Sequence, residues 1–280
     1  MLRYRTMTTR TRPSRHPKRP RRRFNFTGLR IMALLGALIF FGLTSAHQSL
    51  YSRNWTKPLD VVIYPINADR FIATQQYIDT LSSATFTDIE TWASREADRW
   101  NIPLDKPFAV RLGDTVTALP PALPVDATSA DTLIWGLKFR WWAHRHTPKG
   151  DASLTTVRMF VLYYDPFSDK PLAHSLGLQK GLLGVVHAYA TERQAAQNNI
   201  VISHEMLHTV GASDKYEGWG GPVYPYGFTN PLRTPLFPQR SAEIMVGRIP
   251  TSHTSSYMAE SLKSVQINRF TAAEINWIDH

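Results

Sequence analysis

The chain has 280 residues, of which 43% are hydrophobic and 19% are charged. It is long and apolar enough to bury a full core, as one domain or as one domain with a small appendage, which excludes a disordered or fibrous protein. Cysteine is absent, which excludes disulfides and thiolate metal sites, so any zinc ion must be held by histidine and carboxylate groups.

The formal net charge of +10 is concentrated at the N-terminus. Residues 1–30 contain eleven of the 32 Lys and Arg residues and no acid. The rest of the chain therefore contains 21 basic and 22 acidic residues. We interpret residues 1–30 as a basic cytoplasmic tail on a folded part that is nearly neutral. Because a nucleic-acid-binding domain carries its positive charge on a folded surface, we expect no nucleic-acid partner.

Residues 31–46, IMALLGALIFFGLTSA, contain no charged side chain. At about 1.5 Å per residue this run is slightly short for a bilayer core, but its length suits a transmembrane signal-anchor. The arginine-rich flank keeps the N-terminus in the cytoplasm and sends everything after Ala46 across the membrane. The small residues that end the run also suit cleavage of a signal peptide. We therefore expect a periplasmic or extracellular domain that is membrane-anchored, or secreted if the segment is cleaved.

The next residues, 47–58, are predicted to be a linker, and residues 59–280 to form the folded domain. Apolar β-branched runs predict strands, and apolar residues at spacings of three and four predict helices. The expected strands are Leu59–Ile66, Phe108–Leu112, Val157–Tyr164 and Leu182–Ala190. The expected helices are two within Asp69–Asn101, with a break near Ser82, and one each at Asp131–His144, Gln194–Thr209 and Thr271–Ile278. The expected loops are Ala118–Pro124, Asp165–Gly181 and Gly218–Arg240.

This order of elements predicts an α+β (mixed α/β) domain with a single sheet. In the last helix, Thr271 and Glu274 have the spacing of a capping box. The loop Gly218–Arg240 is long and rich in Gly, Pro and Tyr, and such loops in compact domains tend to be functional.

Residues 204–216 read HEMLHTVGASDKY. On a helix, His204 and His208 lie four residues apart and point the same way, so that they can share one cation. Glu205 lies about 100° around the helix from His204, beside a metal ion rather than on it. Catalytic zinc sites use three protein ligands. Gly211 can reverse the chain after the helix without a Cβ penalty, and Asp214 can then return beneath the metal.

The segment HEMLHTVGASD resembles the H-E-x-x-H-x-x-G-x-x-H/D signature of the metzincin zinc peptidases, in the variant with an aspartate ligand that snapalysin-like enzymes have. Met245 follows Asp214 by about thirty residues, where metzincins place a methionine turn under the zinc. The resemblance implies a metzincin-like zincin domain with one twisted sheet and an active-site helix. It implies zinc ligands His204, His208 and Asp214, the general base Glu205 and the structural residue Met245.

Other features of the family are less well matched. Metzincins often carry a tyrosine two residues after the turn methionine, and Gly247 stands at that position. Three tyrosines near the motif are alternative donors to an oxyanion, namely Tyr216, Tyr224 and Tyr226. The metzincin sheet ends in an edge strand that lines the substrate cleft, and Leu182–Ala190 is the candidate for that strand.

Two other carboxylates compete with Asp214 for the third ligand position. Glu217 lies close to Asp214 in the sequence. Glu243 follows His208 by thirty-five residues, a distance at which gluzincin peptidases supply a glutamate from a second helix. Gly211 and Met245 together favour Asp214.

These features predict a zinc-dependent peptidase that hydrolyses peptide bonds outside the cytoplasmic membrane. Zinc would activate a water molecule and Glu205 would act as the general base. The expected partners are a peptide or protein substrate and, through residues 31–46, the membrane. The alternatives are a non-catalytic zinc-binding interaction module of the cell envelope, and a metallohydrolase that acts on peptidoglycan or another amide.

Overall fold

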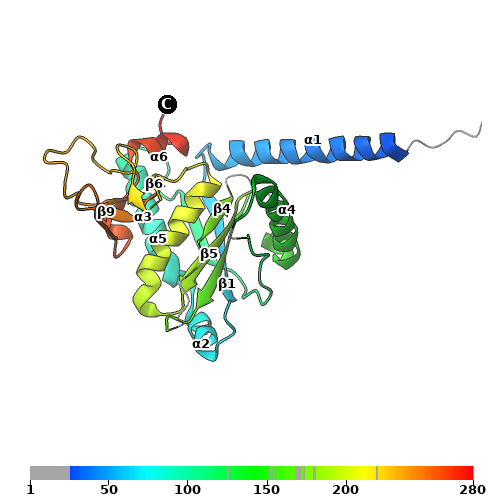
Figure 1. The fold of residues 1–280 in the computed structure, drawn as a ribbon, viewed down its shortest axis with the longest axis horizontal. Coiled ribbons are helices and arrows are strands. Elements are labelled where there is room, and N and C mark those ends of the chain that lie inside the picture. The colour runs from blue at the N-terminus through cyan, green and yellow to red at the C-terminus, as the bar shows by residue number, and fades with distance from the viewer. Residues whose placement is uncertain are drawn as a thin grey trace, which may run out of the picture. The chain divides into compact units, whose positions relative to one another are not determined.

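The computed structural model describes residues 26–124, 126–151, 153, 155–167, 172, 174–178, 181–218 and 220–279. Most of the predicted basic tail, residues 1–25, lies outside the described residues. The chain is a mixed α/β protein built around a five-stranded sheet, in agreement with the predicted class (Figure 1).

Four of the five strands are parallel. The strand order is β2 (Phe108–Leu112), β1 (Leu59–Asn67), β3 (Val157–Tyr164), β5 (Leu183–Tyr189) and β4 (Leu176–Leu178). β4 alone in this sheet is antiparallel, with Leu176 opposite Val185 and Leu178 opposite Leu183. β1 and β3 are nearly continuous apolar runs because parallel strands are buried on both faces.

The predicted helices are present, with small differences at their ends. They are α2 (Ile72–Thr80), α3 (Thr87–Arg99), α4 (Ser129–His146) and α5 (Glu192–Thr209). Short 3-10 helices cover Ser83–Phe86, Lys149–Asp151 and Leu262–Ser264. The predicted break near Ser82 is confirmed, because Ser82 is the extended N-cap of the first of these 3-10 helices and so separates α2 from α3. Its amide donates a hydrogen bond to Thr85 Oγ1 at 3.2 Å.

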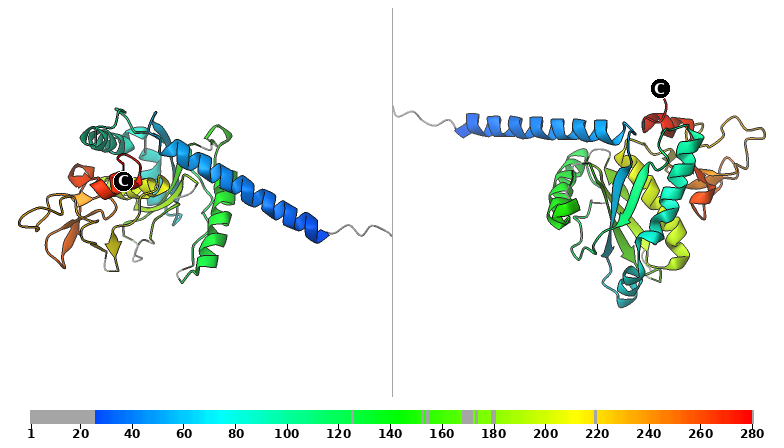
Figure 2. Two further views of the ribbon diagram at one scale, coloured as in Figure 1. Left: turned by 90° about the horizontal axis from the view of Figure 1, so that it is seen from above. Right: turned by 180° about the vertical axis from the view of Figure 1, so that it is seen from behind.

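Helices cover both faces of the sheet. Successive side chains of a strand point to opposite faces, so β1 contributes Val62 and Tyr64 to one apolar cluster and Val61 and Ile63 to another. The first cluster packs against α4 and the second against α3 and α5. Figures 1 and 2 show α4 on the opposite side of the sheet from α3 and α5.

The prediction of the edge strand was wrong. The run expected there, Leu182–Ala190, forms β5, which lies between β3 and β4 inside the sheet. The strand at this edge of the sheet is β4, within the segment Asp165–Gly181 that was expected to be a loop. A strand of three residues with one glycine has too little periodicity to be recognised in the sequence.

Beyond α5 the described chain forms short ladders, the 3-10 helix at Leu262–Ser264 and one short α-helix. Tyr216–Glu217 (β6) pairs with Gly221–Pro222 (β7), Ala242–Glu243 (β8) with Val265–Gln266 (β11), and Arg248–Pro250 (β9) with Ser256–Met258 (β10). The final helix, α6, spans Arg269–Glu274. It begins earlier than predicted because Asn268, not Thr271, caps it by accepting hydrogen bonds from the amides of Phe270 and Thr271. The predicted capping box is therefore wrong.

At the other end, helix α1 spans Phe26–Ser52 and continues into the predicted linker, residues 47–58. The larger compact unit of the chain begins at Gly42. No helix in the described part of the chain combines the length and the apolar character needed to cross a lipid bilayer, so the membrane segment predicted at residues 31–46 is not confirmed.

Candidate metal centre

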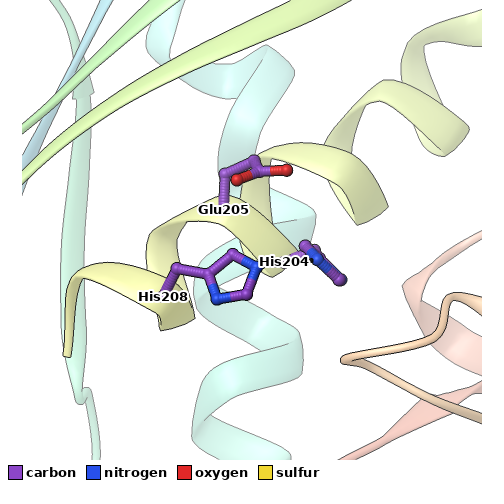
Figure 3. Close-up of side chains that lie close together, drawn as sticks. All are labelled: His204, Glu205 and His208. Atoms are coloured by element: carbon purple, nitrogen blue, oxygen red, sulfur yellow. Dashed lines mark hydrogen bonds between the residues drawn. The ribbon is translucent and has the colours of Figure 1, made fainter. Parts of the chain in front are cut away.

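Helix α5 carries three side chains whose polar atoms lie close together. One ligand atom from each of His204, Glu205 and His208 lies within 4.8 Å of the other two (Figure 3). The two histidines are four residues apart and therefore share one side of the helix. This group could hold a metal ion.

Backbone carbonyls determine which nitrogen of each imidazole ring is available. His204 Nδ1 lies 2.9 Å from the carbonyl oxygen of Ile244, and His208 Nδ1 lies 2.8 Å from that of Ala212. Since a carbonyl oxygen only accepts hydrogen bonds, each Nδ1 donates a proton to it. In a neutral ring the Nε2 atom then presents a lone pair, which is how metal-binding histidines are oriented.

Three atoms with lone pairs converge on one point. Nε2 of His204 lies 3.1 Å from Nε2 of His208, and Oδ1 of Asp214 lies 3.0 Å from the first and 3.1 Å from the second. A tetrahedral ion with bonds of about 2.0–2.1 Å holds its ligands roughly 3.3 Å apart, so the spacing fits such an ion. With neither a metal ion nor a proton between them, the lone pairs of the two rings and the carboxylate would repel one another.

The electrostatics of the same atoms favour a positive charge at this point. Burial acts to raise the pKa of Asp214, but hydrogen bonds from His204 and His208 hold it well below its ordinary range. Burial acts to lower the pKa of His204, but the hydrogen bond to Asp214 and the charge of Glu205 raise it above its ordinary value. A metal ion bound in place of the imidazole proton would be stabilised by the same negative charges of Asp214 and Glu205.

Glu205 is buried beside the two histidines. Among the atoms that the structure describes, no hydrogen-bond partner reaches its Oε2. Burial raises the pKa of Glu205, and the charges of His204 and His208 offset part of this shift. A buried carboxylate oxygen without a partner is destabilising, so this atom is suited to a water molecule or ligand that enters the centre.

A cavity of about 270 Å³ adjoins these groups. It is bounded by the edge strand β4 on one side and by α5 with its following loop on the other. The lining residues are Ser175, Leu176, Gly177, Glu205, His208, Ser213, Asp214 and Tyr216. The volume gives room for several water molecules or for part of a ligand.

Gly177 is a residue of the centre that the sequence did not identify. A Cβ atom at this position would lie 2.4 Å from the carbonyl oxygen of Glu205 and 2.6 Å from Cβ of His208. Only glycine therefore allows β4 to lie directly on α5. A glycine between two leucines is the only signal in the sequence, and it does not by itself indicate which element lies opposite.

The loop that carries Asp214 is held by the last helix. Gly211 has a φ of +110°, which confirms the predicted reversal of the chain after α5. Both neighbours of Asp214 bind Glu274 of α6. Ser213 Oγ donates to Glu274 Oε1 at 2.6 Å, and Lys215 Nζ donates to Oε2 at 2.6 Å. Glu274 was predicted to cap its own helix, and it instead positions Asp214.

Met245 lies next to the residue that orients His204. It is fully buried, it follows Ile244 directly, and its carbonyl oxygen accepts a hydrogen bond from the amide of Lys215 at 3.2 Å. The turn around Met245 therefore contacts both His204 of α5, through Ile244, and the Asp214 loop. This is the region where the sequence placed a methionine turn.

The two other carboxylates considered for the third position, Glu243 and Glu217, have surroundings unlike those of Asp214. Glu243 is fully buried and accepts hydrogen bonds from Thr271 Oγ1 at 2.6 Å and from the amide of Met245 at 2.5 Å. Burial raises its pKa to about 7. The side chain of Glu217 is exposed in β6. Asp214 is thus the carboxylate that contacts both imidazole Nε2 atoms.

The three candidate tyrosines lie in different surroundings. Tyr216 lines the cavity, and its ring centroid lies 6.3 Å from that of His204. Burial and the charges of Asp214 and Glu205 raise the pKa of Tyr216 to about 12. Tyr224 donates to the carbonyl oxygen of Pro231, and Tyr226 packs its ring on another aromatic ring. Tyr216 is the tyrosine that the fold brings to the centre.

Neither the known protein-family models nor the curated proteins contain a match to this chain.

Replacing Glu274 with Gln is expected to weaken metal binding. The buried ammonium group of Lys215 would lose its charged partner, and the loop that presents Asp214 would loosen. Loss of a group that holds a ligand from behind lowers metal affinity by about 10–100-fold. Chelator competition with Zn²⁺ as the probe would measure this change in affinity. The exposed Glu260→Gln provides the control. Equal affinity in both variants would contradict a positioning role for Glu274.

Replacing Glu243 with Gln is expected to change how stability depends on pH. The pKa of Glu243 rises from its ordinary value of 4.5 to about 7 in the folded chain, so the folded chain keeps a proton that the unfolded chain releases. The stabilisation is therefore complete below about pH 4.5 and is lost as the pH rises through about 7.

The Gln side chain cannot ionise, so the variant should gain stability relative to the wild type across this window, by roughly 3 kcal/mol. Urea unfolding at several pH values would measure the difference. The variant should also bind metal as the wild type does. A parallel pH profile in both proteins, or loss of metal, would refute this assignment of Glu243.

Proposed function

We propose that the chain is a zinc-dependent peptidase with His204, His208 and Asp214 as zinc ligands and Glu205 as general base. The observation that carries the proposal is the convergence of three lone-pair atoms, 3.0–3.1 Å apart, beside a buried carboxylate with an unsatisfied oxygen. Two imidazoles and one carboxylate are a donor set that catalytic zinc sites use.

The number of ligands favours a catalytic site over a structural one. A structural zinc ion usually has four protein ligands, whereas a catalytic one has three and leaves one position open. Here three side chains converge and a cavity adjoins them. This argues against the non-catalytic interaction module.

When bound, zinc lowers the pKa of a water molecule and polarises a carbonyl group. Glu205 would accept the proton from that water and pass it to the leaving amine. Its raised pKa suits this task, since a general base works best when its pKa lies nearer the working pH. Tyr216 lines the same cavity, and its hydroxyl group is the candidate hydrogen-bond donor to the oxyanion.

The edge strand supports a peptide as the substrate. β4 pairs with β5 along one side and lines the cavity with Leu176 and Gly177. An extended peptide can add to such an edge through main-chain hydrogen bonds, which would bring its scissile carbonyl toward the zinc ligands. An edge strand that lines the substrate cleft is also what the resemblance to metzincins implies. Met245 would serve as the structural methionine of that family.

The proposed location is outside the cytoplasmic membrane. It rests on the charge-free run at residues 31–46 and on the eleven basic residues that precede or flank it. Such an arrangement leaves the N-terminus in the cytoplasm and exports the domain that follows.

Replacing Asp214 with Ala is expected to remove most of the bound zinc. The wild type should contain one zinc ion per chain. The variant should lose more zinc affinity than the roughly 10–100-fold expected when a group that only positions a ligand, such as Glu274, is replaced. Elemental analysis of the purified proteins would measure this. Glu217→Ala removes the nearby exposed acid and is the matched control. Zinc retained in Asp214→Ala but lost in Glu217→Ala would transfer the ligand role to Glu217.

Replacing Glu205 with Gln is expected to abolish turnover without loss of zinc. Removing a general base lowers the rate by about 10²–10⁴-fold, which cleavage of a quenched-fluorescent peptide library would detect. Glu192→Gln, an exposed acid at the start of the same helix, is the control. Full activity in Glu205→Gln would refute the assignment of the base. A zinc-loaded wild type that cleaves no peptide would refute the peptidase.

A further inference from the structure

Helix α4 is apolar on two opposite sides. Its inner side packs on the sheet through the buried residues Trp135, Phe139 and Ala143. Its outer side carries four apolar residues that are largely exposed. Their exposed fractions are 68% for Leu133, 50% for Ile134, 51% for Leu137 and 63% for Trp141.

These four residues form one continuous row. Their spacings of three and four place them on one side of the helix, and their exposure shows that this side faces away from the sheet. A helix that is apolar on all sides is ordinarily buried. The exposed fractions show that the described parts of the chain leave this row uncovered, and a contiguous exposed apolar patch marks a surface that binds something else.

Basic side chains border the row. Lys138, His144 and Arg145 are all exposed, and the guanidinium carbon of Arg145 lies 5.9 Å from the centroid of the Trp141 ring. The helix contains a single acid, Asp131, which is occupied in the capping box of the first turn. The outer side of α4 therefore combines apolar and positively charged groups.

A membrane surface with anionic lipids offers both complementary chemistries at once. Leucine, isoleucine and tryptophan side chains enter the boundary between headgroups and acyl chains, and Lys and Arg side chains extend to the phosphates. Tryptophan is enriched at this depth of the bilayer. The sequence also predicts a membrane segment at residues 31–46, which would hold α4 at a high effective concentration near a bilayer.

We propose that the outer face of α4, formed by Leu133, Ile134, Leu137 and Trp141 with Lys138 and Arg145, binds the surface of a membrane that contains anionic lipids. This face is on the opposite side of the sheet from the metal centre on α5. The proposal therefore does not depend on the proposed peptidase activity.

Because the chain contains no cysteine, a single cysteine introduced into the full-length chain can be labelled specifically. A nitroxide label would be attached to Leu137→Cys on the outer face or to Leu232→Cys, an exposed leucine in the loop beyond α5 that serves as the control. Each protein would be reconstituted in vesicles of phosphatidylcholine and phosphatidylglycerol. Collision rates with oxygen and with a water-soluble nickel chelate would report the depth of the label. Far-UV circular dichroism and cooperative thermal unfolding would verify that both variants fold.

The label at position 137 should be several-fold more accessible to oxygen and several-fold less accessible to nickel than the label at position 232. Adding Lys138→Glu and Arg145→Glu, or omitting phosphatidylglycerol, should reduce the difference, because both changes remove attraction to the phosphates. Equal nickel accessibility at the two positions would overturn the proposal. Protection from both reagents, with or without lipid, would also overturn it and would assign the face to a protein partner or a second copy.

Discussion

The candidate metal centre depends on two hydrogen bonds that orient imidazole rings. The carbonyl groups of Ile244 and Ala212 each accept the Nδ1 proton of one histidine, so that both Nε2 lone pairs point to the position that Asp214 also reaches. Helix periodicity alone brings His204 and His208 to one side of α5, but it does not choose the tautomer or the ring orientation. The two carbonyls supply both, and one of them comes from a turn far along the chain.

Residues of the predicted linker and of the C-terminal segment together hold Asp214, the proposed third ligand, in place. Trp55 donates to the carbonyl oxygen of Ile275 at 2.7 Å, and Asn276 donates to that of Arg53 at 2.9 Å. These contacts hold the end of α6, and Glu274 of α6 then binds the residues on either side of Asp214. The position of Asp214 therefore depends on contacts among segments that are distant in the sequence, which explains why so short a loop can present a carboxylate accurately.

The sheet separates two surfaces of different chemistry. On one side, β4 and α5 bound a polar cavity with carboxylate, imidazole and phenol groups. On the other side, α4 presents an apolar row bordered by cations. Because the two clusters of core residues contact different faces of the sheet, a change on the outer face of α4 leaves the packing of α5 intact. The proposed membrane binding and the proposed chemistry at the centre can thus be tested independently.

Local pattern determined most of the elements and the side chains of the candidate metal-binding group. The strands Phe108–Leu112 and Val157–Tyr164 were predicted with the bounds that the structure has, because continuous apolar runs and helical spacing are local signals. The H-E-x-x-H spacing likewise specifies which side chains can share a cation. The sequence could not show that β4 lies at the edge of the sheet next to α5, or that Glu274 binds the Asp214 loop. It also could not show that Glu243 accepts a hydrogen bond from Thr271 and lies outside the candidate centre. Each of these depends on which distant segments meet, and that is decided only when the whole core packs.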